Sequence, residues 1–168
     1  MVDSKSAGMG TGFVALAAAR AAGGGADIDS VVEQAIMERN RVHAYLVVQR
    51  LENLRRSGRI GAAASWLGTA LAIKPLLRID DGQLVLDQRV RTTSKATAVM
   101  IEQVLENVGE QRGALAVHHV DNPSAAAEVA ATLTSALPAC GTPIVTDLGP
   151  VLGTHLGPGA VGVVYLAG

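Results

Sequence analysis

Two strand-like segments separated by a tight turn constrain the fold of this chain most strongly. Residues 73–79 (IKPLLRI) and 83–90 (QLVLDQRV) flank Asp81 and Gly82. Both turn residues accept the positive φ that a two-residue hairpin requires, so the pattern predicts an antiparallel hairpin. Pro75 lacks a backbone N–H and therefore predicts either that its strand is an edge strand or that the proline stands at the strand's start.

The remaining sequence alternates between helical and strand-like patterns. We expect helices over 12–22, around 51–58, over 62–72 and from Pro123 to about Leu137. Two further helices have expected N-caps: one begins after Asp27, and one begins after Ser94 and ends at about Val108. Strands are expected over 42–48, 114–120, 143–149 and 160–167, and the glycine-rich residues 149–159 predict a loop or a short helix. Because hairpin and crossover connections both occur, the prediction is an α/β fold with a mixed β-sheet and packed helices.

Composition excludes several classes of function. The chain has 168 residues, 49% of them apolar and 17% charged, with a net charge of −1, so it can bury a core but shows no basic surface for nucleic acid. Cys140 is alone, which excludes an intrachain disulfide and fits a reducing cytoplasm. The apolar run Phe13 to Ala19 is far shorter than the roughly 20 residues of a membrane span, so membrane insertion is not expected.

The segment VDSKSAGMGTG contains the first candidate site. Glycines followed by a helix leave backbone N–H groups unpaired at the helix N-terminus, and Ser4 and Ser6 add hydroxyl donors. This combination suits an anion or a carboxylate. The alternative is that both serines only cap the helix. The spacing of a phosphate-binding P-loop is absent.

The second candidate site is the segment GTHLGPG, where Gly157 and Gly159 bracket a proline in a tight turn. His155, just before this turn, can donate a hydrogen bond to an anionic group or exchange a proton near neutral pH. A histidine that only bonds a turn carbonyl is the alternative, and the sequence weighs the two equally.

Other residues give weaker indications. His118 and His119 are adjacent on a strand, so they point to opposite faces and cannot chelate one metal together; a structural role is expected, and no metal site is predicted. Arg59 and Arg91 are candidates to face a phosphate, although solvated arginines are the common case. Trp66 either lines a lipid tunnel or belongs to an ordinary core. We find no pairing of a nucleophile with a base, so catalysis is not expected.

Together these motifs resemble the DegV family of fatty-acid-binding proteins. The resemblance rests on VDSKSAGMGTGF, LENLRRSGRIG with the following LGTALAIKPLL, IDDGQLVLDQRVRT and THLGPGAVG, which run in family order over the whole chain. It implies a non-catalytic carrier that buries a long acyl chain between two α/β domains. It also implies a separate fatty acid kinase as partner, which converts the presented acid to an acyl phosphate for phospholipid synthesis. No cofactor is implied.

The resemblance also assigns residues. Ser4 matches the serine whose hydroxyl binds the fatty-acid carboxylate, and His155 matches the histidine of the family's H-x-G-P-G turn near the carboxyl group. Arg91 and Arg59 match two family arginines, and which of them faces the kinase or the phosphate stays open.

The chain departs from the family pattern at its beginning. Family members carry a preceding α/β half, whereas here the first forty residues predict two helices and no strand. We therefore expect residues 1–40 to be the end of the N-terminal domain and 41–168 to be the C-terminal domain. The alternative to a lipid carrier is a truncated fragment that binds no ligand and associates, as a homo-oligomer, through exposed apolar surface.

Overall fold

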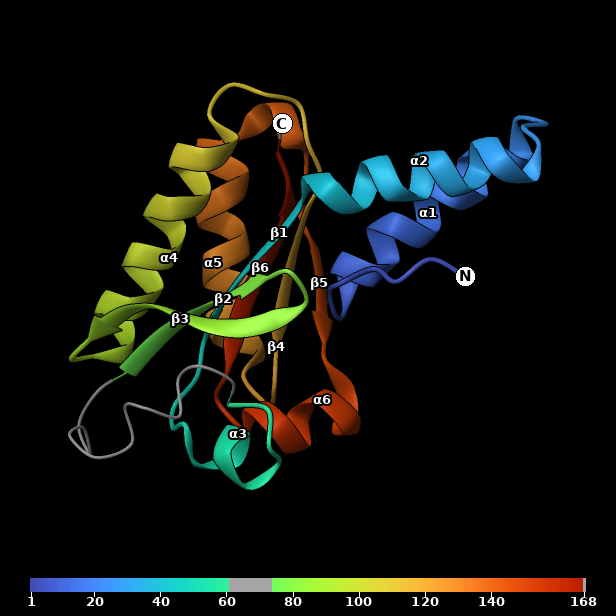
Figure 1. Ribbon diagram of the computed structural model, residues 1–168. Coiled ribbons are helices and arrows are strands. Elements are labelled where there is room, and N and C mark those ends of the chain that lie inside the picture. The colour runs from blue at the N-terminus through green and yellow to red at the C-terminus, as the bar shows by residue number, and fades with distance from the viewer. Residues whose placement is uncertain (61–73, 168) are drawn as a thin grey trace.

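The computed structural model describes residues 1–60 and 74–167 and contains one six-stranded mixed sheet (Figure 1). The strand order is β3-β2-β1-β6-β4-β5, in which only the β4–β5 pair is parallel among the pairs described. The strands are β1 (Val42–Val47), β2 (Lys74–Asp80), β3 (Gln83–Val90), β4 (Leu115–His119), β5 (Ile144–Asp147) and β6 (Val161–Leu166). The helices are α1 (Met9–Gly23), α2 (Ile28–Arg41), α3 (Glu52–Arg56), α4 (Thr93–Val108), α5 (Pro123–Ala136) and α6 (Gly149–Leu156), with a 3₁₀ turn at Pro138–Cys140. The α/β class and the mixed sheet are confirmed.

The hairpin predicted from Asp81 and Gly82 forms β2 and β3. The two residues have φ of 47° and 81°, and Asp80 pairs with Gln83 across the turn. Of the two alternatives for Pro75, the edge position is wrong, because β2 lies between β3 and β1. The proline instead stands second in its strand, where the missing N–H costs little.

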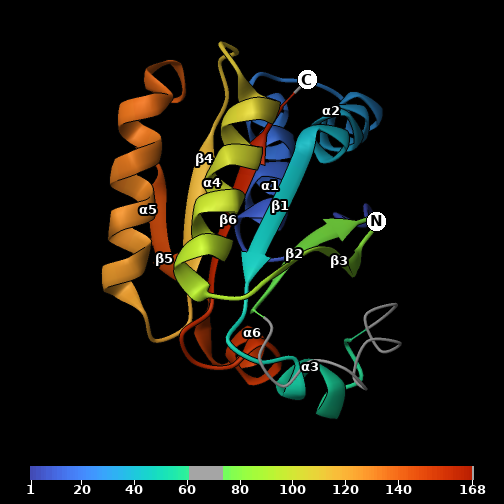
Figure 2. The same cartoon turned by 90° about the vertical axis from the view of Figure 1, so that its left-hand side faces the viewer.

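The main core lies between the sheet and the pair α4 and α5, which cover one face (Figure 2). Helix α4 buries Ala96, Met100, Val104 and Val108, a spacing of four residues that keeps all four side chains on one stripe. They pack against strand residues such as Val163, which is also fully buried. Burial of each large aliphatic side chain contributes about 1.5–3 kcal/mol, so this face contributes most to stability.

The opposite face of the sheet is covered at two separate places. Near one end, Phe13 of α1 packs on Ala44, Ala116 and Val164, whose small or branched side chains allow the helix to approach closely. At the other end, α3 and α6 close the sheet (Figure 1), and Leu54 and Leu156 join a second buried cluster there. The face between these two covers is where a cavity forms.

Local sequence signals, such as helix caps, predict most of the remaining elements. Asp27 caps α2 by accepting a hydrogen bond from the Ser30 N–H, as predicted. The cap of α4 is Thr92 rather than Ser94, because the Thr92 hydroxyl accepts from the Lys95 N–H at 3.3 Å. The helix predicted over 62–72, with Trp66, lies outside the described residues.

Candidate functional site

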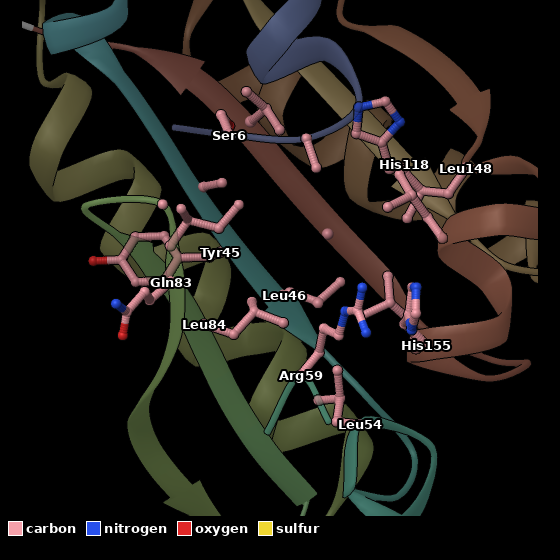
Figure 3. A pocket seen from close by; sticks show the side chains of 18 of the residues that line it. Ser6, Tyr45, Leu46, Leu54, Arg59, Gln83, Leu84, His118, Leu148 and His155 are labelled. Atoms are coloured by element: carbon pink, nitrogen blue, oxygen red, sulfur yellow. The ribbon is translucent and has the colours of Figure 1, made fainter. Parts of the chain in front are cut away.

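A cavity of about 420 Å³ lies on the sheet face opposite α4 and α5 (Figure 3). Its wall comes from the segment before α1, from β1, β4 and β6, from the β2–β3 hairpin, and from α3 and α6 with the residues beside them. The lining is mostly apolar and includes Ala44, Leu46, Leu54, Ile79, Leu84, Leu148, Leu152, Leu156 and Val164. A concave, largely apolar space with few polar groups is the usual form of a small-molecule site.

Within residues 1–60 and 74–167, two buried side-chain atoms of the cavity-lining residues have no hydrogen-bond partner. They are the Ser6 Oγ, on the segment before α1, and the His155 Nδ1, on α6. Buried polar side-chain atoms are almost always satisfied, because leaving one unpaired costs about 1–3 kcal/mol. A ligand with a hydrogen-bonding group is one source of the partner that these two atoms lack among the described residues.

The segment before α1 is held in a compact turn. The Ser4 hydroxyl donates to the Ser6 carbonyl at 3.3 Å or pairs with the Thr11 hydroxyl at 2.8 Å, and Ser4 itself does not line the cavity. Gly10 lets this turn lie against α1, because a Cβ there would stand 1.9 Å from the Ser6 Oγ. Ser6, rather than Ser4, therefore lies in the cavity wall, with its Oγ packed against Gly10.

The turn after His155 depends on its glycines. Gly157 and Gly159 have φ of 78° and 83°, and Cβ atoms there would stand 2.1 Å from Asn53 Nδ2 and 2.8 Å from Gln49 Cγ. The Gly159 carbonyl also accepts a hydrogen bond from the Gln49 side chain. Neither glycine lines the cavity, and both fix the turn that follows α6. The segment predicted as a loop or short helix is helix α6, which carries His155.

The two candidate arginines lie in different places. Arg59, just after α3, is exposed and also lines the cavity, and its Nη1 donates to the Ser57 carbonyl at 2.8 Å. Arg91 is exposed between β3 and α4 and is not part of the cavity wall. The structure therefore brings Ser6, Arg59 and His155 to one cavity and leaves Arg91 apart from them.

Sequence reasoning missed that His118 also lines this cavity. Its ring is only 4% exposed, its Nε2 accepts a hydrogen bond from the Met9 N–H at 2.9 Å, and its Nδ1 lies 3.4 Å from the Thr146 carbonyl. Burial lowers the pKa of His118 below its ordinary value, and the neighbouring His119 lowers it further. His119 points elsewhere, to Asp147 at 3.3 Å, so the prediction of opposite faces is confirmed. The alternation of small residues on this face, such as Ala116, is the signal that could have located the cavity.

Within residues 1–60 and 74–167, no group of three or more His, Cys, Asp or Glu side chains is arranged to hold a metal ion. In the same ranges, no helix combines the length and the apolar character that crossing a membrane requires.

Comparison with known proteins shows the family of this chain. A family model described as an uncharacterised protein of the DegV family matches residues 1–168. A DegV domain-containing protein of Mycobacterium tuberculosis is 60% identical over 163 residues, which cover 97% of this chain and 58% of the relative. This chain therefore spans a little over half of that relative's length.

Solved structures show the same fold. A DegV family protein from Corynebacterium glutamicum superposes with a TM-score of 0.90 at 32% identity, covering 99% of this chain and 63% of that one. DegV from Bacillus subtilis, described as a fatty acid binding protein, superposes with a TM-score of 0.88 at 29% identity, covering 99% of this chain and 60% of that one. The chain belongs to the DegV family.

Proposed function

We propose that this chain binds a long-chain fatty acid and acts as a carrier rather than as a catalyst. The observation that carries the proposal is the apolar cavity whose wall includes Ser6 and His155; the Ser6 Oγ and the His155 Nδ1 are buried and have no hydrogen-bond partner among the described residues. Apolar walls suit the acyl chain, whose burial contributes about 0.8 kcal/mol per methylene. A hydroxyl or an imidazole N–H suits the carboxylate, which only accepts hydrogen bonds. The Bacillus subtilis relative, described as fatty acid binding, supports the same ligand class.

The carboxylate contact can be assigned by comparing two ligands. Palmitate and methyl palmitate share the acyl chain, but only palmitate carries a charged head group. The affinities of Ser6→Ala and His155→Phe are measured for both ligands. Ser4→Ala is measured in the same way, because the family resemblance assigns the carboxylate contact to Ser4. A residue that binds the carboxylate weakens palmitate when it is replaced and leaves methyl palmitate unchanged. Equal losses for both ligands would assign the residue to the wall instead.

We further propose that the bound acid is presented to a fatty acid kinase, which forms the acyl phosphate. Arg59 supports this step, because it is exposed to solvent and also lines the cavity, so one cation can contact both the ligand and a partner. Arg91 is the second candidate, on a separate exposed surface. The rate at which a purified kinase phosphorylates palmitate should fall with Arg59→Gln or with Arg91→Gln. A variant whose arginine contacts only the kinase should still bind palmitate with the affinity of the wild type.

The carrier proposal includes a cytoplasmic location and a division of the chain into residues 1–40 and 41–168. Cys140 is free, which agrees with a reducing compartment. Helices α1 and α2 pack on each other, while α1 also reaches the sheet through Phe13. If the first forty residues are the end of a preceding domain, residues 41–168 alone should still unfold cooperatively in urea, and loss of that transition would contradict the division.

A second candidate function is supported by exposed apolar side chains. Leu16, Ile28 and Met37 of α1 and α2 are 40%, 74% and 58% exposed, and Val151 of α6 is 74% exposed. Such a surface favours association, which is the behaviour of a fragment that binds no ligand and forms homo-oligomers. Light scattering decides between the two: a monomeric, compact chain that binds palmitate excludes the fragment reading.

A further inference from the structure

The first turn of α1 is capped from a distant strand. The first N–H groups of a helix have no partner inside the helix and usually bond to the side chain of the N-cap residue. Here the N-cap is Gly8, which has no side chain, and the Met9 N–H donates instead to His118 Nε2 on β4. A residue 109 positions away in sequence therefore does what a capping serine or aspartate would do.

The close approach of the ring depends on Gly8. A Cβ at this position would stand 2.9 Å from His118 Nε2, and the φ of Gly8 is 55°, which side chains rarely adopt. Met9 can only donate through its N–H, so Nε2 must accept and the ring proton must sit on Nδ1. Nδ1 lies 3.4 Å from the Thr146 carbonyl, which accepts a hydrogen bond from the Nδ1–H in that tautomer. The contacts on both sides of the ring agree on one neutral form.

The capped turn is also the turn that carries Ser6. The Gly10 N–H donates to the Ala7 carbonyl at 3.0 Å, and the Thr11 hydroxyl donates to the Ser6 carbonyl at 3.0 Å. These bonds tie residues 6–8 to the start of α1, so a fixed Met9 also fixes Ser6 at the cavity.

We propose that His118 is a positioning residue: its neutral imidazole caps α1 and thereby holds residues Ser6–Met9 in the conformation that binds the acid. The proposal rests on the proposed fatty-acid site. Protonation of Nε2 places a second ring N–H against the Met9 N–H, and the hydrogen bond that caps α1 is lost. Among the described residues that line the cavity with His118, the other titratable groups are Tyr45, Arg59 and His155, so no carboxylate of the wall offsets the added charge. Towards β5, His119 and Asp147 face each other at 3.3 Å.

The test uses the full chain and palmitate as the probe, with affinity measured from pH 8 to pH 5. Wild type is expected to lose about tenfold in affinity as His118 gains its proton, the effect of one lost hydrogen bond to a buried amide. His118→Gln keeps an acceptor that does not titrate, and His118→Phe keeps the ring shape without an acceptor. The glutamine variant should bind like wild type at pH 8 with a flatter pH profile, whereas the phenylalanine variant should bind about tenfold more weakly at pH 8. Titration of palmitate itself affects all three equally and cancels in the comparison.

Nitrogen NMR of the wild type keeps the test decisive if a variant fails to fold. The expected result at pH 8 is a neutral His118 with its proton on Nδ1 and a Met9 amide that exchanges slowly, the protection being lost as the ring protonates. A proton on Nε2 at pH 8, or equal affinities for wild type and His118→Phe, overturns the proposal. A wild type with the expected tautomer that binds no palmitate would instead refute the proposed function and leave the cap established.

Discussion

Gly10→Ala tests whether the packing of Ser6 against α1 is as tight as the structure indicates. Gly10 lies inside α1, where alanine is intrinsically favoured by about 1 kcal/mol. The new Cβ, however, would stand 1.9 Å from the Ser6 Oγ and 2.7 Å from the Ser6 Cβ. Rotation of the hydroxyl relieves the first contact but not the second, so the segment that carries Ser6 must shift.

The size of the effect follows from two opposing contributions. Overpacking of this kind destabilises by about 1–3 kcal/mol, which the helical preference for alanine offsets by about 1 kcal/mol. Gly23→Ala is the matched control, because Gly23 ends the same helix and a Cβ there meets nothing within 4 Å. We expect Gly10→Ala to be less stable than Gly23→Ala by about 2 kcal/mol, or several degrees in Tm for a chain of this size.

Urea unfolding followed by circular dichroism measures this difference, and palmitate binding measures its consequence for the site. Gly10→Ala should bind more weakly because Ser6 is displaced, whereas Gly23→Ala should bind like wild type. If Gly10→Ala proved as stable as Gly23→Ala and bound palmitate equally well, residues 4–8 would not pack as described.

Three further predictions concern pH, the tryptophan and the free hydroxyl. Burial lowers the pKa of both His118 and His43 in the folded chain. The free energy of unfolding should therefore fall as the pH drops below about 6.5, the ordinary histidine pKa, towards the lowered pKa of the folded state. Urea midpoints measured at pH 8 and pH 5.5 test this, and an unchanged midpoint contradicts it. Trp66, the single tryptophan, should be quenched by a spin-labelled fatty acid if it lines the acyl site, and full emission in the saturated complex would place it elsewhere. Ser6→Ala should raise or maintain stability without ligand, because it removes a buried hydroxyl that has no partner among the described residues, and it should weaken palmitate binding. A loss of about 1 kcal/mol or more in urea unfolding would mean that the Ser6 hydroxyl has a structural partner.

The hairpin and the capped helix α2 were predictable because their signals are local. Asp81 and Gly82 set the turn by their backbone preferences, and Asp27 caps α2 through a bond three residues away. The N-cap of α4 was harder to predict, because Thr92 and Ser94 are both residue types that cap helices well. The structure uses Thr92, and this choice depends on how the chain leaves β3.

The site was predictable in its residue types but not in its assembly. Ser6, Arg59 and His155 are candidates by chemistry, and their meeting at one cavity is a matter of tertiary structure. His118 shows the limit most clearly, because strand alternation gives its face but not the helix that covers that face. The glycine-rich residues before the turn are a helix, because Leu152 and Leu156 pack into the cluster around Leu54 and outweigh the low helix propensity of glycine.

Mass spectrometry of a solvent extract from the purified, folded chain asks whether the chain holds a fatty acid. Folding is checked first by circular dichroism, and the chain is measured both as purified and after incubation with palmitate. We expect one long-chain fatty acid per folded chain. A folded chain that releases no fatty acid in either case would contradict it, and lipid binding would then require more of the protein than these 168 residues.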